Sequence, residues 1–567
     1  MKKLKIIFFT ILLLIIVGVT AFIMLKKNED NQEDNPSIDL SEQLTPSPTQ
    51  IPTNLPTATP TDTPNQMTGL YPAYKTFDDK TSYGYINLSG EFVISPSFDM
   101  ASNFYDDVAV VMIGESYRVI DKEGNVLFEN ENTINDYRNG AAVYLSKNKS
   151  GNYVYGYIDT KGDVLIHPQY IRATNFSKEG TAYVSTSIGS YQLIDKTGKI
   201  LESYELNKYN SIWNLQDGYL IYVDDNTYQY GVATLEDKEV IKANYSEIRY
   251  LGEGLFAVKE PNLLSAEDII LAKNAIINQQ GEQLTDYIYS DVSNFYEGYA
   301  SATDGTSTFF IGTDGKEITT LSKFDGQGTL ILLEDVVSAY IDDEQIYTDT
   351  SGTVLWKAED TFALSDTLTV KKEILKPNPY VLVKYPQIDG LADKTIQDNI
   401  NEELKSIFTD SRNRLTVDDM ISVKDTFTAK LMNNLLIIRK DGYDYSFGAA
   451  HGMPIREYYY IDLKDGSFYL LKNLFKEDSD YASKINELIT NEIEAQNASG
   501  EAYYFPDSFT GINEDYQAFK LEEDGIIIYF YPYEIAAYAA GFPEFPITFE
   551  VLSEYIDTNG DFYKSFR

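Results

Sequence analysis

One histidine stands in a segment where it could do chemistry. His451 lies in SFGAAHGMP, among small residues and close in sequence to Tyr445, Phe447 and Tyr458. An imidazole in such a setting can bind a ligand or act as a general base. The alternative is that His451 forms hydrogen bonds within a tight loop and orients it, and the sequence favours this structural role.

The aromatic segment YFYPYEIAAYAAGFPEFPI is a second candidate. Tyr533 and Tyr538 stand there among small residues and prolines, with Tyr531, Phe542 and Phe545 nearby. Flat aromatic faces with polar tips can stack on sugars or form the centre of a protein interface. Packing in a core would explain the same residues. We predict a ligand-binding site, with no catalytic residue assigned, from His451, Tyr445, Phe447, Tyr458, Tyr533 and Tyr538.

No motif identifies a reaction. The sequence has no P-loop, no G-x-S-x-G and no dinucleotide fingerprint. DTNGD, residues 557–561, resembles the start of a calcium loop, but Phe562 occupies the position where that loop needs glycine. The other histidine, His167, replaces Ser95 of an equivalent repeat, which favours a structural role. With two histidines and no cysteine, we predict neither a metal site nor a cofactor.

The charge balance limits the partners. The chain has 87 Asp and Glu against 46 Lys and Arg, a net charge of -41. Nucleic acids and anionic lipid surfaces would repel it, so we expect no nucleic acid partner. Cationic proteins, metal ions and neutral glycans remain open.

The N-terminal residues predict a membrane anchor followed by a stalk. In 1–27, an apolar run from Ile6 to Leu25 lies between lysine clusters, and at about 1.5 Å per residue it would cross a hydrocarbon core of roughly 30 Å. The lysines before it favour a cytoplasmic N-terminus, with the bulk of the chain extracellular. Residues 28–69 are acidic and then rich in Pro and Thr, which predicts an extended stalk or a disordered linker.

Residues 70–362 repeat one pattern about eight times. Two short apolar strands flank a turn that opens with Asp or Asn and closes with Gly, as in YIDTKGDVLI. This is typical of type I turns in β-hairpins. The opening residues are Asn87, Asp121, Asp159, Asp195, Asn278 and Asp349. Such units fit a β-propeller-like ring or an open β-solenoid.

Helical patterns interrupt and then follow the repeats. In EPNLLSAEDIILAKN, Ser265 and Asp268 predict the capped start of a short helix that projects from one repeat. Residues 365–567 lose the repeat and combine strands with two amphipathic helices, which predicts an α+β domain. The predicted apolar helix faces are Ile396, Ile400, Leu404 and Ile407, and Tyr481, Ile485, Leu488 and Ile493.

Two resemblances support this organisation. GYIDTKGDVLIHPQY followed by NFSKEGTAYV, and GYINLSGEFVISPSFD, resemble the WG-type repeat of bacterial extracytoplasmic proteins, with Tyr-Gly in place of Trp-Gly. YPQIDGLADKTIQDNIN, FGAAHGMPIREYYYIDLKDGSFYLLKNLF and EDGIIIYFYPYEIAAYAAGFPEFPI resemble the domain-of-unknown-function pair of lysozyme-sensing anti-sigma factors and some peptidoglycan deacetylases. The resemblance implies an outward-facing module associated with the cell wall.

The function we expect is binding or sensing outside the cell membrane. The ligand would be a cell-wall glycan or a secreted cationic protein such as lysozyme. A wall-glycan enzyme and a structural spacer of the envelope are the alternatives. The expected fold is multidomain: a transmembrane helix, an all-β repeat domain and a C-terminal α+β domain.

Overall fold

The computed structural model describes residues 69–77, 80–187, 189–206, 212–236, 238–263, 265–500 and 503–567. The predicted membrane anchor, 1–27, lies outside these ranges, as does the predicted stalk except for its last residue, Gly69. Among the helices of the described residues, none is long and apolar enough to span a lipid bilayer.

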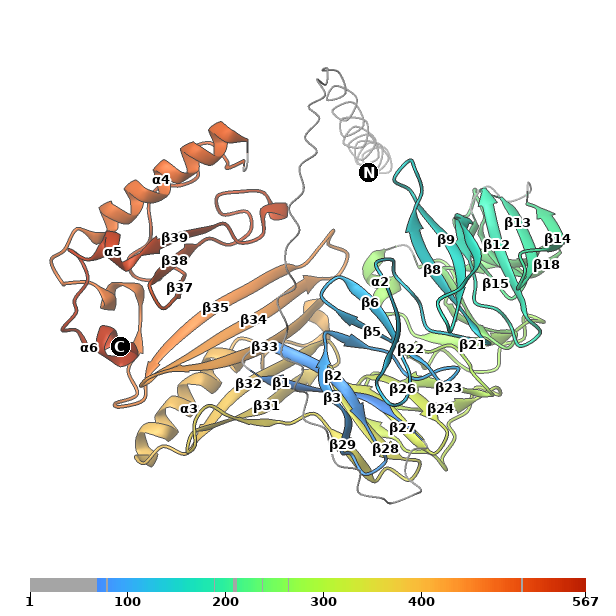
Figure 1. Ribbon diagram of the computed structural model, residues 1–567, viewed down its shortest axis with the longest axis horizontal. Coiled ribbons are helices and arrows are strands. Elements are labelled where there is room, and N and C mark those ends of the chain that lie inside the picture. Colours follow the sequence, from blue (N-terminus) through green and yellow to red (C-terminus); the bar gives the residue numbers. More distant parts are fainter. Residues whose placement is uncertain are drawn as a thin grey trace, which may run out of the picture. The chain divides into compact units, whose positions relative to one another are not determined.

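Residues 71–357 fold into small antiparallel sheets, each built from consecutive strands (Figure 1). The described residues form eight of them, numbered here sheet 1 to sheet 8. Sheets 1 to 4 contain, in turn, β1 (Tyr71–Phe77), β2 (Lys80–Ile86) and β3 (Phe92–Phe98); β4 (Met100–Ala101), β5 (Ala109–Ile113), β6 (Ser116–Ile120) and β7 (Val126–Asn130); β8 (Ala141–Lys147), β9 (Tyr153–Asp159) and β10 (Val164–Tyr170); β11 (Arg172–Ala173), β12 (Thr181–Ser187), β13 (Ser190–Asp195) and β14 (Ile200–Glu205).

Sheets 5 to 8 follow the same plan. They contain, in turn, β15 (Ile212–Gln216), β16 (Tyr219–Val223), β17 (Tyr230–Thr234) and β18 (Glu239–Tyr245); β19 (Glu247–Gly252), β20 (Leu255–Lys259) and β21 (Asn274–Asn278); β22 (Asp291–Val292), β23 (Tyr299–Thr303), β24 (Ser307–Gly312) and β25 (Phe324–Asp325); β26 (Gly328–Leu333), β27 (Val336–Ile341), β28 (Glu344–Asp349) and β29 (Val354–Lys357). Strands of different sheets are not paired in the described chain, so these sheets do not join into a hydrogen-bonded barrel.

Side-chain hydrogen bonds explain the tight turns between these strands. At each of the six predicted turns, Oδ1 of the opening Asp or Asn accepts the backbone N–H groups two and four residues later. The closing glycine donates its N–H to the carbonyl of the opening residue and has a positive φ, 75° at Gly90. The six turns are therefore confirmed. One more turn of this kind, from Asn148 to Gly151, was missed.

Apolar side chains hold successive sheets together. Eight buried clusters each combine residues of two sheets, and together they link sheet 1 through to sheet 8 and sheet 8 back to sheet 1. In the last of these clusters, Tyr71 and Ile86 of sheet 1 pack with Val336 and Tyr347 of sheet 8. The Tyr347 hydroxyl also donates to the Pro72 carbonyl, 275 residues away, at 2.7 Å. The first and last sheets are thus in direct contact.

The predicted insertion contains helix α2 (Ala266–Leu271), which lies between β20 and β21. The Ser265 side chain accepts the Asp268 N–H at 2.9 Å, as the capping pattern predicts. No residue of the helix is buried. It is a short helix inserted between two strands of sheet 6, as expected, with side chains that are exposed or partly buried.

The C-terminal region is built on a seven-stranded sheet, with α3 (Lys394–Thr409) beside it (Figure 1). Asp393 caps α3 by accepting the backbone N–H of Thr395 at 2.9 Å. Ile400 and Leu404 of the predicted helix face are fully buried against the sheet. The strands are, in spatial order, β30 (Thr361–Ala363), β31 (Thr369–Asn378), β32 (Val381–Asp389), β33 (Ile421–Met432), β34 (Leu435–Ser446), β35 (Met453–Asp462) and β36 (Phe468–Tyr469).

Both faces of β34 are buried, because alternate residues point to opposite sides of a strand. Leu436 and Ile438 share a core with α3, whereas Leu435 and Ile437 share a second core with the last third of the region. That part contains β37 (Phe519–Leu521), β38 (Gly525–Tyr529), β39 (Glu544–Thr548), α4 (Tyr481–Ser499), α5 (Phe549–Leu552) and α6 (Asp561–Phe566). It also contains the short 3-10 turns Leu471–Leu474 and Tyr538–Ala540, whereas a third, Val417–Asp419, precedes β33.

Tyr460 attaches the small sheet to the large one. Its buried hydroxyl donates to the Phe519 carbonyl and accepts the Leu521 N–H, both at 2.9 Å. These bonds satisfy backbone groups of β37, the edge strand. Tyr481 and Ile485 of the second predicted helix face are buried in the same core. The described chain is thus a mostly β multidomain protein with a C-terminal α+β region.

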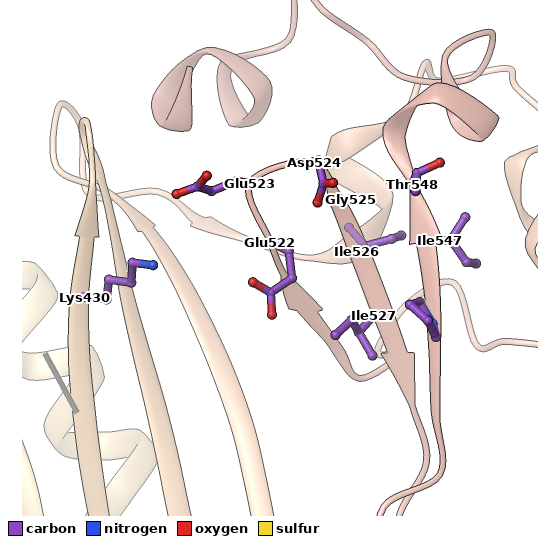
Figure 2. Close-up of a pocket in the computed structure, with 10 residues that line it drawn as sticks. Lys430, Glu522, Glu523, Asp524, Gly525, Ile526, Ile527, Ile547 and Thr548 are labelled. Atoms are coloured by element: carbon purple, nitrogen blue, oxygen red, sulfur yellow. The ribbon is translucent and has the colours of Figure 1, made fainter. Parts of the chain in front are cut away.

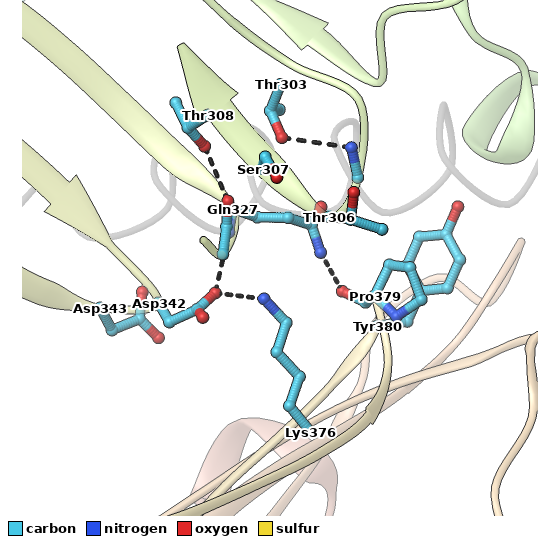
Figure 3. Close-up of polar contacts among 12 residues, drawn as sticks. Thr303, Thr306, Ser307, Thr308, Gln327, Asp342, Asp343, Lys376, Pro379 and Tyr380 are labelled. Carbon is cyan, nitrogen blue, oxygen red and sulfur yellow. Dashed lines mark hydrogen bonds and ion pairs between the residues drawn. The ribbon is translucent and has the colours of Figure 1, made fainter. Parts of the chain in front are cut away.

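Acidic residues of sheet 8 meet lysines of the C-terminal sheet. In the turn between β27 and β28, Asp342 pairs with Lys376 at 2.5 Å and Asp343 with Lys424 at 2.9 Å. Lys372 and Lys384 both approach the Glu344 carboxylate at 2.7 Å. Gln327 also donates to the Pro379 carbonyl (Figure 3). Strongly acidic repeats and a lysine-bearing sheet are therefore joined by ion pairs.

Candidate functional site

Three of the predicted site residues come together in one aromatic cluster. His451 lies in the loop between β34 and β35, and Tyr533 and Tyr538 lie between β38 and β39. The rings of His451 and Tyr538 are stacked, with centroids 3.8 Å apart and planes at 25°. Tyr533 lies 5.9 Å from His451 and 5.7 Å from Tyr538, centroid to centroid. We call His451, Tyr533 and Tyr538 the aromatic cluster.

Both nitrogens of His451 have partners. Nδ1 lies 3.1 Å from the carbonyl oxygen of Gly452, and Nε2 lies 2.9 Å from the hydroxyl of Tyr533. A carbonyl can only accept, so we infer that Nδ1 carries the proton and that Nε2 accepts from the phenol. These two contacts fix the orientation of the imidazole ring. The His451 ring is thus held within its loop, and Tyr538 covers one of its faces.

The backbone of Tyr533 is in an unusual conformation. Its φ is +70°, the left-handed region that side-chain-bearing residues rarely adopt. Tyr533 follows Pro532 in a turn that is closed by a hydrogen bond from the Glu534 N–H to the Tyr531 carbonyl, at 3.0 Å. Tyr533 is the third residue of this turn, a position that glycine or asparagine usually holds in type II turns. Such strain persists where the surrounding structure imposes it, often at binding sites. Here it presents a side chain that is 51% exposed.

Gly452 allows the loop to pack tightly beneath the cluster. A Cβ atom at this position would lie 2.5 Å from the Tyr443 ring, too close for any side chain. The Gly452 N–H donates to the Tyr443 hydroxyl, and the Tyr538 hydroxyl donates to the Gly452 carbonyl, both at 2.9 Å. Desolvation, and then the neighbouring phenol of Tyr443, raise the pKa of Tyr538. Tyr538 therefore remains a neutral hydrogen-bond donor at pH 7.

The other three predicted site residues have different partners. The Tyr445 hydroxyl donates to the Ala449 carbonyl at 3.2 Å within the same loop, and Phe447 is buried against Tyr380, 5.0 Å between centroids. Tyr458 packs against the second core, and burial raises its pKa. Its side chain helps to support the sheet. The structure therefore brings together His451, Tyr533 and Tyr538 but not the whole predicted set.

Sequence reasoning missed Tyr443 and the contact between Arg456 and Phe542. Tyr443 lies two residues before Tyr445 on β34, so the alternation of a strand could have placed it on the same face. Nearby, the Arg456 guanidinium lies 4.4 Å from the centroid of the Phe542 ring and pairs with Glu544 at 2.6 Å. Phe545, by contrast, is buried in the second core, which bears out the core alternative for that residue.

A cavity lies elsewhere in the C-terminal region. It measures about 400 Å³ and is lined by the acidic turn from Glu522 to Asp524, by Ile527 and Ile547, and by Lys430 of β33 across the opening (Figure 2). Glu522 already pairs with Lys520 at 2.5 Å. The charged residues of its lining are thus three acidic side chains and one lysine.

A buried charge network underlies the sheet below the site. The Asp425 side chain is fully buried and accepts from Arg412 at 2.9 Å, with Lys440 at 3.7 Å. Arg412 also donates to both oxygens of Asp444, each at 2.9 Å. Burial raises the pKa of Asp425, and the charges of Lys440 and Arg412 oppose this shift. The network fixes β33 and β34, the strand that leads to the His451 loop.

The described residues offer no metal site, since no three His, Asp or Glu side chains gather there. His167 is exposed on β10, away from the aromatic cluster in sequence and sheet. In the calcium-like segment, Asp557 instead accepts the Asn559 N–H at 3.0 Å, which makes it a local turn. What the site can do is stack on and hydrogen-bond to a flat or cyclic ligand.

Comparison with known proteins matches two parts of the chain. A family described as "WG containing repeat" matches residues 83–117, 155–186 and 276–304. A family described as "Protein of unknown function (DUF3298)" matches residues 472–550, which include Tyr533 and Tyr538. The peptidoglycan-N-acetylmuramic acid deacetylase PdaC of Bacillus subtilis is 26% identical over 167 residues, which cover 28% of this chain and 34% of that protein. The chain thus spans about a third of this relative's length.

Solved structures of DUF3298 family proteins are also similar. One from Bacteroides fragilis is 18% identical, covers 36% of this chain and 99% of its own, and has a TM-score of 0.27. One from Pseudomonas aeruginosa is 17% identical, covers 35% and 98%, and also has a TM-score of 0.27. The chain carries WG-containing repeats and a C-terminal DUF3298 domain, in agreement with the two resemblances of its sequence.

Proposed function

We propose that the aromatic cluster binds a glycan of the cell wall. The observation that carries this proposal is the stack of His451 and Tyr538 beside the strained, half-exposed Tyr533. Such a set presents an aromatic face for the C–H groups of a sugar, and its phenol oxygens, whose protons are already donated within the protein, can accept hydrogen bonds from sugar hydroxyls. A net charge of -41 favours neutral glycans over anionic polymers.

The relationship to a peptidoglycan deacetylase supports the choice of ligand. Only about a third of that relative is matched, so the proposal takes from it the association with the wall and not the reaction. Both nitrogens of His451 are engaged, which favours binding over catalysis. In this proposal the protein is extracytoplasmic, held in the membrane by residues 6–25 with its N-terminus in the cytoplasm.

We also propose that sheets 1 to 8 form a closed, β-propeller-like ring that carries the binding domain. The support is the chain of eight apolar clusters that returns from sheet 8 to sheet 1, with the bond from Tyr347 to Pro72 at the closure. A ring would leave no unpacked sheet at either end of the repeats.

Cosedimentation of the full-length chain with purified peptidoglycan tests the binding function. Wild type should sediment with the polymer, whereas Tyr538→Ala and Tyr533→Ala should each weaken binding about tenfold, the loss expected for one stacked aromatic. Tyr516→Ala is the matched control, because Tyr516 is 77% exposed and lies outside the cluster. Equal binding by all four proteins would refute the proposal.

A further inference from the structure

A groove between sheets 7 and 8 combines exposed aromatic side chains with carboxylates. It measures about 160 Å³, and its lining includes Tyr296, Tyr299 and Ile331. Their side chains are 62%, 38% and 43% exposed. Large apolar side chains at neighbouring positions of two sheets make a patch that solvent reaches, and such patches often mark interaction sites.

Two acidic residues stand at the groove, Glu297 and Glu334. Each lies in the tight turn before the next strand, Glu297 before β23 and Glu334 before β27, and both have a left-handed backbone, with φ of 51° and 54°. The equivalent turn of sheet 6 begins at Glu253, whose carboxylate accepts the Gly298 N–H at 2.9 Å. This hydrogen bond links the Glu253 turn to the turn that contains Glu297. The turn geometry therefore fixes the backbone positions from which the Glu297 and Glu334 side chains extend.

One carboxylate of the groove already holds a lysine. Lys178, in the equivalent loop of sheet 4, lies 3.3 Å from Glu297, and both side chains are more than half exposed. An exposed pair of this kind contributes little stability and exchanges readily for another cation. The Glu297 carboxylate of the groove is thus placed where a lysine ammonium group can pair with it.

These features define the chemistry of an occupant. A lysine or arginine side chain can lay its aliphatic stem along Ile331, place its cation near the rings of Tyr296 and Tyr299, and pair with Glu334. The net charge of -41 adds long-range attraction for a basic partner. An acidic or neutral segment would gain neither contribution.

We propose that this groove binds a lysine- or arginine-rich segment of a partner protein. The site is separate in residues from the aromatic cluster, so it can be present whether or not that cluster binds glycan. Binding should weaken as salt rises, because exposed charges are screened.

Fluorescence anisotropy with the full-length chain and a labelled oligolysine peptide tests the proposal. Tyr296→Ala and Glu334→Gln should each weaken binding about fivefold, as expected for the loss of a cation–π contact or an ion pair. Glu494→Gln, on the exposed face of α4, removes the same charge elsewhere and should leave binding unchanged.

Two results would overturn the proposal. Equal weakening by Glu334→Gln and Glu494→Gln would mean that net charge alone attracts the peptide. Wild-type affinity in Tyr296→Ala would mean that the groove is not used. Both altered side chains are exposed or at the rim, and unchanged circular dichroism and peptidoglycan cosedimentation would separate a local loss from a failure to fold.

Discussion

The β repeats and the C-terminal α+β region are stabilised in different ways. In the repeats, seven hairpins are specified by an Asp or Asn turn, and each apolar cluster involves two neighbouring sheets. In the C-terminal region, two cores share one sheet, and residues far apart in sequence form the aromatic cluster and the buried charge network. Local chemistry thus builds a scaffold, whereas long-range packing builds a site.

The largest expected effect is in the C-terminal region. Asp425→Ala should lower the free energy of unfolding of this region by about 3 kcal/mol. The substitution removes the buried carboxylate that pairs with Arg412 and Lys440, and it leaves their positive charges without this partner. Urea unfolding measures the loss of stability, and hydrogen exchange of the β33 and β34 amides shows where it occurs.

The matched control is Asp441→Ala, whose pair with Arg439 is about one-third exposed. It should cost at most about 1 kcal/mol. If both variants lowered the free energy of unfolding equally, the burial of Asp425 would not matter. The contrast between the two regions would then lose its clearest support.

A smaller effect is expected where sheet 8 meets sheet 1. Tyr347→Phe removes the hydroxyl that donates to Pro72 and keeps the buried ring, so it should destabilise the repeats by about 1 kcal/mol. Exchange of β1 and β28 amides should rise while exchange in α3 stays the same. A rise confined to the C-terminal region would show that this hydrogen bond does not stabilise the contact between sheets 1 and 8.

The smallest effect is a pH dependence in the turns. Hydrogen bonds from the Ser351 hydroxyl and then from the Thr353 N–H lower the pKa of Asp349 to about 2 from its usual 3.8. Since the folded pKa is depressed, the stabilisation is present above about pH 4 and is lost as pH falls towards 2.

Asp349→Asn keeps the accepting oxygen, as Asn87 and Asn278 show in equivalent turns, but it cannot titrate. Acid unfolding of this variant should therefore depend less on pH between 4 and 2 than that of wild type. The stability of the two proteins at pH 7 should be similar. An unchanged acid profile would show that this carboxylate does not contribute to acid sensitivity.

The same contrast explains what the sequence could predict. Asn87, Gly90 and their equivalents specify turns through neighbours within four residues, so the hairpins were predictable, as were the buried face of α3 and the cap of α2. The contact of His451 with Tyr533 spans 82 residues and depends on how β35 packs near the β38–β39 loop. Residue type suggested both residues, but their pairing and the contribution of Tyr443 required the fold.

If the aromatic cluster binds a wall glycan, the glycan must lie close to the His451 ring. The chain has two histidines, so selective labelling of histidine Cε1 gives two NMR signals, and His167 on β10 is an internal control. Addition of soluble peptidoglycan fragments to the full-length chain should shift the His451 signal and leave the His167 signal in place. No shift of either signal at saturating fragment, or equal shifts of both, would contradict the account.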